Sequence, residues 1–371
     1  MIYLDNAATT RKKPLKTILE IIKSILIYNA NPSRGSHKAS VKAGIKVLSC
    51  REHIKQFVNA PTSAKVVYTY NCTEAINIAL FGCLNEHDHV IISAFEHNAV
   101  VRTLHQLKQK NITYSVVKPD CYNNITIEEI KKHLTPNTKL IVINHTSNVT
   151  GTTTNLKPIG DFCKENNIMF MVDGAQSAGH ETIDVTKNNI NLLCLAGHKG
   201  LFGTQGIGAL IINNANPAPL KFGGSGTNSL SPEMPEYYPD KLEAGTINLL
   251  GIMALDGGIS FVEKHQQKIN KKTLKLATTL YSYLKQNPSI IIYSTCIKSG
   301  VISFNFKNKS TDEVVNFLNE HGICVRGGLH CAPLAHKQIN TLYTGTVRVS
   351  ISYFNTMNEI KKLIKVLKKI A

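Results

Sequence analysis

The sequence lacks any segment with the features of a membrane span or a secretory leader. Its longest apolar runs, such as Lys139–Ile143, have the length of a strand, whereas a span needs about 20 apolar residues. The first residues do not show the charged-then-apolar order of a signal peptide. Internal repeats and low-complexity tracts are also missing. These absences predict a cytoplasmic protein that does not engage a membrane.

The nine cysteines are odd in number and include no C-x-x-C pair. Neither a disulfide framework nor a cysteine-based zinc site fits this spacing, and no other metal site is expected. We expect most of the thiols, such as Cys50 and Cys163, to be small buried apolar groups. One of them can still be a nucleophile.

Acidic residues are scarce, at 25 against 42 Lys and Arg, which gives a formal charge of +17. Such a charge could attract nucleic acid or an acidic protein. However, the lysines are spread along the whole chain, as in a compositional bias towards Lys, Asn and Ile. The densest basic segment, 361–369, has Leu and Ile at helical spacing and fits the solvated face of a helix. Nucleic-acid binding is therefore not expected as the main function, although a non-catalytic basic binding protein remains an alternative.

Strands and helices are predicted to alternate from about residue 15 to residue 254. The predicted strands are 66–70, 90–92, 139–144, 168–172, 192–196 and 208–212, and helices are predicted at 73–80, 99–108 and 158–167. This alternation favours βαβ units, right-handed crossovers and a mostly parallel sheet. Residues 221–245 are rich in Gly, Ser and Pro and predict a long loop with a functional or partner-binding role.

A smaller α+β unit is predicted after a long helix at 253–285. Its strands are expected near 290–293, 301–306, 323–326 and 347–350, and its helices at 311–320 and 357–370. The chain is long enough for a large domain with a smaller one attached. We predict a large domain at 15–252 and a small domain formed by 1–14 with 253–371.

Polar residues follow five predicted strands. Because ligands of open parallel sheets bind outside the carboxyl ends of the strands, these residues are expected to converge. They are Asn71-Cys72-Thr73-Glu74-Ala75, Ala94-Phe95-Glu96-His97-Asn98, Asn144-His145-Thr146-Ser147-Asn148, Asp173-Gly174-Ala175-Gln176 and Gly197-His198-Lys199.

Two of these residues match the central needs of pyridoxal 5′-phosphate (PLP). Lys199 can form the imine with the aldehyde, and Gly200 and Gly203 after it permit a close backbone approach. Asp173, at the end of an apolar strand, can keep the pyridine nitrogen protonated. An isolated Asp at such a position is more often a cap or a turn residue, and Gly-His-Lys-Gly alone is a weak signal.

The remaining needs of the cofactor are a flat side chain on the ring and donors for the phosphate. His97 could stack on the ring, although a lone His before Asn is usually a surface or capping residue. Thr73 opens a predicted helix, whose first turn suits a phosphate. No single one of these residues predicts a PLP enzyme. The prediction comes from all of them together, in this order along the chain and at the ends of predicted strands.

The chain resembles the class-V aminotransferase family, and within it the cysteine desulfurases, over essentially its whole length. The motifs that carry the resemblance are Tyr3-Leu4-Asp5-Asn6-Ala7-Ala8-Thr9-Thr10, Asn31-Pro32-Ser33-Arg34-Gly35-Ser36-His37, Cys72-Thr73-Glu74-Ala75-Ile76-Asn77, Glu96-His97-Asn98-Ala99, Ser147-Asn148-Val149-Thr150-Gly151, Val172-Asp173-Gly174-Ala175-Gln176-Ser177, Gly197-His198-Lys199-Gly200, Glu243-Ala244-Gly245-Thr246 and Arg326-Gly327-Gly328-Leu329-His330-Cys331-Ala332.

The resemblance implies a fold-type I PLP enzyme, with a mostly parallel seven-stranded sheet in the large domain. It implies a homodimer with the site near the interface. Carried over by motif, the cofactor-binding residues are Lys199, Asp173, Gln176, His97, Thr73, Asn148 and His198, together with Gly245 and Thr246 for the phosphate of the neighbouring subunit. The substrate-binding residues carried over are Arg348 for the substrate carboxylate, Asn148, Arg326, Ala7 and Arg34.

Cys331 is the residue through which the resemblance indicates the reaction, with Lys199 and His97 as the other catalytic residues. Its thiolate, favoured by a nearby Arg or His⁺, would attack the sulfur of the bound substrate. The implied reaction converts L-cysteine to L-alanine and leaves a persulfide for an acceptor protein that the sequence does not identify. Destinations such as iron–sulfur cluster assembly or tRNA thiolation, and a preference for L-selenocysteine, stay open.

Three positions depart from the family's group-II pattern. Ala196 stands where a hydroxyl residue is common, and Gly327 and Leu329 replace Thr and His in the loop before Cys331. The segment 222–227 also differs, although the short Cys331 loop favours group II over group I. The alternatives within the cofactor class are a selenocysteine lyase and another β-eliminating or transaminating enzyme.

Overall fold

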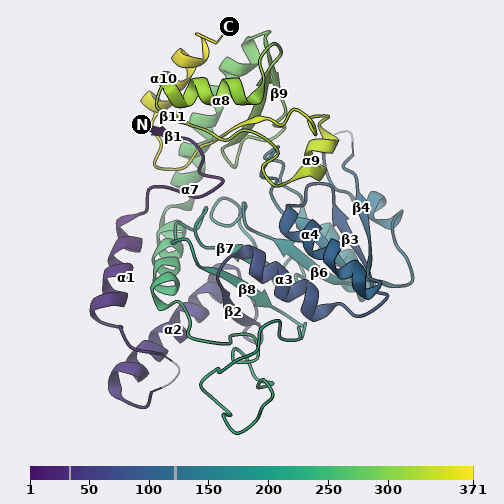
Figure 1. Ribbon diagram of the computed structural model, residues 1–371, viewed down its shortest axis with the longest axis vertical. Helices are drawn as coiled ribbons and strands as arrows, with labels where there is room; N and C mark the ends of the chain where they lie inside the picture. The colour runs from purple at the N-terminus through teal and green to yellow at the C-terminus, as the bar shows by residue number, and fades with distance from the viewer. Residues whose placement is uncertain (33–34, 121–122, 371) are drawn as a thin grey trace.

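A seven-stranded sheet forms the centre of the computed structural model, which describes residues 1–32, 35–120 and 123–370 (Figure 1). The strand order is β2-β8-β7-β6-β5-β3-β4. Within this sheet β8 alone runs opposite to the other six strands. The α/β fold with a mostly parallel sheet is therefore confirmed. The strands are β2 Lys65–Thr69, β3 His89–Ser93, β4 Thr113–Val117, β5 Thr138–Asn144, β6 Met169–Asp173, β7 Leu192–Ala196 and β8 Gly208–Ile212.

Both faces of this sheet are apolar and both are covered by helices. In β3, Ile91 packs into one core, whereas Val90 and Ile92 pack into the core on the other face. This alternation explains why the strands are continuous apolar runs. The first core is covered by α2 Lys38–Phe57, α5 Ile127–Lys131, α6 Leu156–Glu165 and the first half of α7 Leu249–Gln286, and the second by α3 Cys72–Cys83 and α4 Asn98–Leu107. The 3₁₀ turn η1 (Lys108–Lys110) follows α4.

A smaller unit packs around the second half of α7 (Figure 1). Its three-stranded antiparallel sheet has the order β12-β10-β9, and β1 at the N-terminus pairs in parallel with β11. The elements are β1 Ile2–Tyr3, β9 Ile290–Ile292, β10 Val301–Phe306, α8 Thr311–Glu320, β11 Ile323–Cys324, α9 Pro333–Gln338, β12 Val347–Ser350 and α10 Met357–Leu367. The predicted domain division at 252/253 falls inside α7.

The helix α1 (Leu15–Leu26) lies along α7. The predicted long loop is present, because residues 213–248 form no helix or strand. None of the helices in the described residues is both long and apolar enough to cross a bilayer.

Candidate active site

The carboxyl ends of β3, β5, β6 and β7 meet at one edge of the sheet because these strands are parallel. Asn144 and Asp173, the last residues of β5 and β6, are direct partners across the sheet. A cavity lies at this edge. It is lined by Asn71, Cys72, Thr73, Ile76, His97, Ala99, Asn144, Asn148, Asp173, Ala175, Gln176, Ala196, His198 and Lys199. Seven of the predicted site residues are thus brought together.

Lys199 lies just after β7, in a turn that is packed closely against the backbone. A Cβ on Gly200 would lie 2.2 Å from the carbonyl oxygen of Ala178, so glycine is required for this approach. Thr10 Oγ1 donates a hydrogen bond of 2.8 Å to the Lys199 carbonyl. Burial lowers the pKa of the Lys199 amine, and the carboxylate of Asp173 opposes this shift. A lowered pKa increases the fraction of Lys199 that is a neutral amine, and the neutral amine is the form that attacks an aldehyde.

Asp173 is only 3 % exposed, and two donors hold its carboxylate. Oδ1 accepts from the Ala175 backbone N–H at 2.9 Å and from Cys72 Sγ at 3.5 Å. Burial raises the pKa of Cys72, so this thiol stays protonated and can donate. Sequence reasoning did not assign a role to Cys72, although it stands next to Thr73 in a motif of the family.

His97 and His198 are both neutral in this cavity. His97 is the N-cap of α4, and its Nδ1 accepts from the Ala99 backbone N–H at 3.0 Å. Burial lowers the pKa of His97 to about 4 and that of His198 to about 4. In its neutral form, His97 therefore carries its proton on Nε2. Because neither imidazole is charged, an anionic group in this cavity would be bound by neutral hydrogen-bond donors. The first turn of α3, which includes Thr73, offers such donors.

Asn148 and Gln176 connect the cavity with neighbouring loops. Asn148 Nδ2 donates to the His330 carbonyl at 2.7 Å, and Gln176 Nε2 donates to the Ala7 carbonyl at 3.0 Å. Ala7, which was predicted to bind substrate, contacts the lining residue Gln176 but does not itself line the cavity.

Arg348 is 1 % exposed and already has two acceptors. Its Nη2 donates to Asp5 Oδ1 at 2.9 Å and its Nη1 to the Asn148 carbonyl at 3.1 Å. Its buried Nε has no partner among the described residues. Burial lowers the pKa of Arg348, whereas Asp5 raises it.

Cys331 is exposed, and Arg326 Nη2 lies 3.6 Å from its sulfur. The Cys331 carbonyl accepts from the backbone N–H of Asn98, the residue after His97, at 2.7 Å. This contact places the Cys331 loop beside the cavity. The neighbouring His330 is neutral because burial lowers its pKa to about 2. Of the two cations considered from the sequence, Arg326 is therefore the one beside the thiol.

Unpaired buried atoms indicate that the cavity can receive a polar aromatic group such as PLP. The buried atoms Asn144 Oδ1, Asn148 Oδ1 and His198 Nδ1 find no hydrogen-bond partner in the described part of the chain. All three residues line the cavity with Lys199 and Asp173, and buried polar atoms normally have partners. Asn144 received no role from the sequence beyond its place at a strand end. Ala196 also lines the cavity, so the hydroxyl that it lacks would have faced the ligand.

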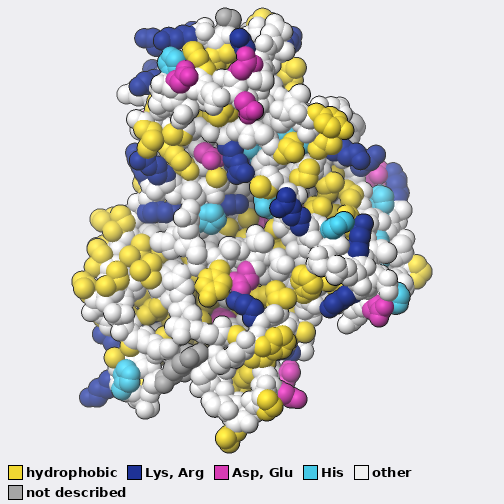
Figure 2. All heavy atoms as spheres, viewed as in Figure 1, with side chains coloured by type: hydrophobic (Ala, Val, Ile, Leu, Met, Phe, Trp, Pro, Cys, Tyr) yellow, Lys and Arg dark blue, Asp and Glu magenta, His cyan; other side chains and the backbone are white. Residues whose placement is uncertain are grey.

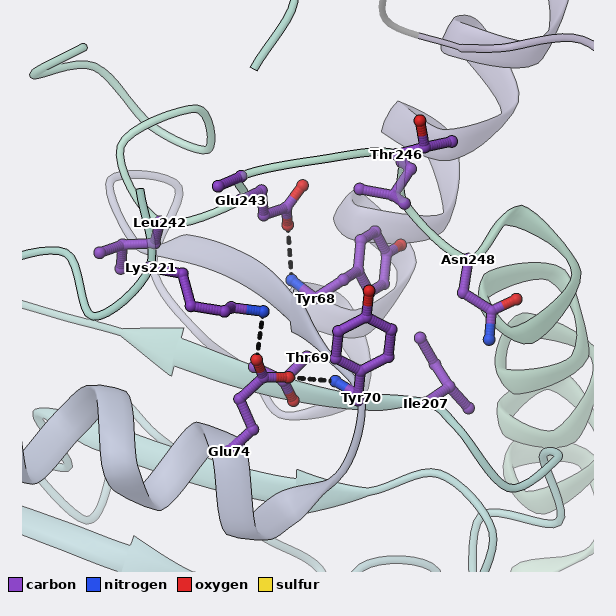
Figure 3. Close-up of a pocket in the computed structure, with 12 residues that line it drawn as sticks. Tyr68, Thr69, Tyr70, Glu74, Ile207, Lys221, Leu242, Glu243, Thr246 and Asn248 are labelled. Carbon is purple, nitrogen blue, oxygen red and sulfur yellow. Dashed lines mark hydrogen bonds and ion pairs between the residues drawn. The ribbon is translucent and has the colours of Figure 1, made fainter. Parts of the chain in front are cut away.

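Six predicted residues within the described part of the chain do not line this cavity: Ala7, Gly245, Thr246, Arg326, Cys331 and Arg348. Thr246 lines a different pocket with Tyr68, Tyr70 and Glu74, and Gly245 precedes it on the same segment (Figure 3). Arg34 lies outside the described residues.

The comparisons with known proteins identify the family. The model of the aminotransferase class-V family matches residues 2–363. The chain belongs to this family. It is 33 % identical over 380 residues to a probable cysteine desulfurase of Methanothermobacter thermautotrophicus, covering 100 % of this chain and 94 % of the relative. It is 31 % identical to a probable cysteine desulfurase of Borreliella burgdorferi, covering 100 % of this chain and 92 % of that relative.

Solved structures agree with this assignment. The apo structure of cysteine desulfurase from Thermococcus onnurineus matches with a TM-score of 0.90 at 28 % identity, covering 100 % of this chain and 94 % of that one. The S-sulfonic acid form of the cysteine desulfurase CsdA from Escherichia coli matches with a TM-score of 0.86 at 26 % identity, covering 99 % of this chain and 94 % of that one. The chain is a PLP-dependent enzyme of fold type I, and the comparisons favour a cysteine desulfurase over the alternatives considered from the sequence.

Proposed function

We propose that this enzyme converts L-cysteine to L-alanine and that Cys331 receives the sulfur as a persulfide. The observation that carries the proposal is the position of Cys331. Its thiol is exposed beside Arg326, and its backbone is bonded to Asn98, next to the cavity residue His97. An exposed thiol beside a cation has the features of a reactive cysteine.

The side chains divide the work of binding and proton transfer. Bound PLP supplies an electron sink for the bonds at the substrate's α-carbon. Asp173 would hold the proton of the ring nitrogen, and the Lys199 amine would move the α-proton. Arg348 would bind the substrate carboxylate, for which a guanidinium is suited.

The sulfur step balances without an external oxidant or reductant. The Cys331 thiolate forms an S–S bond with the substrate sulfur while the bond from that sulfur to Cβ breaks. The electron pair of the broken bond stays with the carbon, which takes up a proton to become the methyl group of alanine. In total, one thiol and one cysteine become one persulfide and one alanine.

The test is incubation of the PLP-loaded protein with L-cysteine, followed by measurement of alanine, pyruvate and the mass at Cys331. Alanine with a one-sulfur adduct is expected, and Cys331→Ala should lose both. The control Cys324→Ala changes a partly exposed thiol outside the cavity and should retain them. Pyruvate without an adduct, or parental sulfide release by Cys331→Ala, would refute the proposal. A parallel assay with L-selenocysteine tests the substrate preference.

The same proposal includes a homodimer, and α1 supplies the main support. This helix turns the polar residues Thr17, Glu20 and Ser24 inwards and leaves an apolar face exposed, which is the reverse of an ordinary surface helix. Apolar side chains gather over α1 at the left of Figure 2. The exposed face consists of Leu15, Ile18, Leu19, Ile22, Ile25 and Leu26 of α1, with Val41, Ile45 and Leu48 of α2.

A second copy of the chain is the proposed cover of this face. Ile18→Lys combined with Ile22→Lys should give a monomer in light scattering, whereas Leu274→Lys, at an exposed position on α7, should leave the dimer intact. A monomeric parent protein would contradict this part of the proposal. We also propose a protein acceptor for the sulfur and a cytoplasmic location. The location is supported by the free thiols of the eight described cysteines.

A further inference from the structure

His330 precedes the sulfur-carrying cysteine but does not line the Lys199 cavity. It is 2 % exposed, whereas Cys331 beside it is exposed. The mechanism above does not use this buried imidazole, and the family resemblance gave it no role. Its contacts nevertheless determine where the Cys331 loop lies.

The backbone of the loop has an unusual conformation at both residues. His330 has φ 50° and Cys331 has φ 58°, so two successive non-glycine residues occupy the left-handed region. Such residues persist when surrounding contacts hold them. The two carbonyls are held by Asn148 Nδ2 and by the Asn98 backbone N–H, each at 2.7 Å. Both of these donors belong to segments that contribute residues to the cavity.

The imidazole ring provides a third anchor on the opposite side of the loop. His330 Nε2 lies 3.1 Å from the carbonyl oxygen of Thr346 and 3.1 Å from its Oγ1. Because a carbonyl only accepts, Nε2 carries the proton and donates. The backbones of Thr346 and Gly328 also exchange two hydrogen bonds, of 3.2 and 3.1 Å. The ring is therefore fixed to the segment that leads into β12 and Arg348.

We infer that His330 is a positioning residue whose ring, anchored on Thr346, holds the Cys331 thiol beside Arg326 at the edge of the Lys199 cavity. This inference rests on the proposed function in one respect, the acceptance of sulfur by Cys331. A misplacement of about 1 Å can lower a rate about 100-fold, so loss of the anchor should act on the sulfur step. Cofactor and substrate binding should be unaffected because the ring does not reach the cavity.

The test compares three variants of the PLP-loaded enzyme. His330→Asn tolerates the left-handed backbone but its shorter side chain loses the Thr346 contact. His330→Gln can place an amide N–H near the position of the former Nε2. Thr346→Val removes the Oγ1 acceptor but keeps the carbonyl acceptor, so it serves as the matched control. In a single turnover with L-cysteine, His330→Asn should form the Cys331 adduct about 10- to 100-fold more slowly. The visible cofactor spectrum and the KM of His330→Asn should stay at parental values. His330→Gln should recover most of the parental rate of adduct formation, and Thr346→Val should keep the parental rate.

A second readout does not depend on the proposed function. Without cysteine present, iodoacetamide should alkylate Cys331 several-fold more slowly in His330→Asn, because the thiolate loses its contact with Arg326. Parental adduct and alkylation rates in His330→Asn would overturn the inference, as would a His330→Gln no better than His330→Asn. A loss of cofactor binding in parallel with the rate would also overturn it, by showing a merely structural role. An adduct missing from the parent enzyme, with alkylation still slowed in His330→Asn, would instead refute the proposed function.

Discussion

Removal of the Glu243 carboxylate should destabilise the protein by about 3–5 kcal/mol, the usual effect of breaking a buried ion pair from one side. The side chains of Arg51 and Glu243 are 10 % and 6 % exposed, and two bonds of 2.7 and 2.5 Å join them. Glu243 also accepts from the Tyr68 backbone N–H at 2.6 Å, a bond drawn in Figure 3. Glu243→Ala therefore leaves a buried guanidinium and a buried amide without this partner. With an unfolding entropy of ~2.1 cal/mol/K per residue over 371 residues, the loss corresponds to a fall in Tm of about 4–6 °C.

Urea unfolding of the variants measures this loss directly. The control is Lys157→Ala on α6, which removes one member of an ion pair with Asp161 whose side chains are 43 % and 39 % exposed. This change should cost less than about 1 kcal/mol, as is usual for a surface ion pair. Replacing both members of the buried pair, by Arg51→Met with Glu243→Leu, should cost less than Glu243→Ala because no buried charge remains. If Glu243→Ala unfolds at the same urea concentration as Lys157→Ala, the reasoning about the buried Arg51–Glu243 pair is wrong.

Three further predictions concern a pH dependence, a helix cap and the cofactor-binding carboxylate. Asp256 raises the pKa of His53 from 6.5 to about 8. The raised pKa stabilises the folded protein by about 2 kcal/mol below pH 6.5, and this stabilisation is lost as the pH rises through 8. The free energy of unfolding, measured across that pH range, should therefore fall for the parent protein but not for His53→Ala. Ser310 and Glu313 form a capping box at the start of α8, and Ser310→Ala should cost about 1 kcal/mol in urea unfolding, whereas a loss within error would show that the cap is not needed. Asp173→Asn removes a charged hydrogen-bond acceptor worth about 1.5–3 kcal/mol and should lower kcat for alanine formation about 10- to 100-fold; a parental kcat would exclude the proposed role of this carboxylate.

The fold could be predicted from the sequence where the strands are buried on both faces. The apolar runs that became β3, β5, β6 and β7 were predicted because a parallel sheet covered by helices needs continuous apolar strands. The edge strand β4 (Thr113–Val117) was not predicted. It is only partly buried and has a polar Ser115 at its centre, so it has neither a continuous run nor a clear alternation.

The candidate site was predictable to the same extent, because it is built from the ends of these strands. The register of the parallel strands brings Asp173, Lys199 and His97 to one edge, and seven predicted residues line one cavity there. Other contacts join segments that are far apart in the chain. The bond from Arg348 to Asp5 spans 343 residues and that from Asn148 to the His330 carbonyl spans 182. No local pattern encodes such pairs.

The sequence by itself thus determined the family, the cofactor and the residue types of the site, since each depends on apolar periodicity or on a short motif. The tertiary structure decided the charge state and the neighbours of these residues. It showed that burial makes His97, His198 and His330 neutral, and that Arg326 is the cation beside Cys331. It also placed Thr246 in a separate pocket from Lys199. Protonation and proximity depend on what packs around a group in three dimensions, and distant parts of the chain supply that packing.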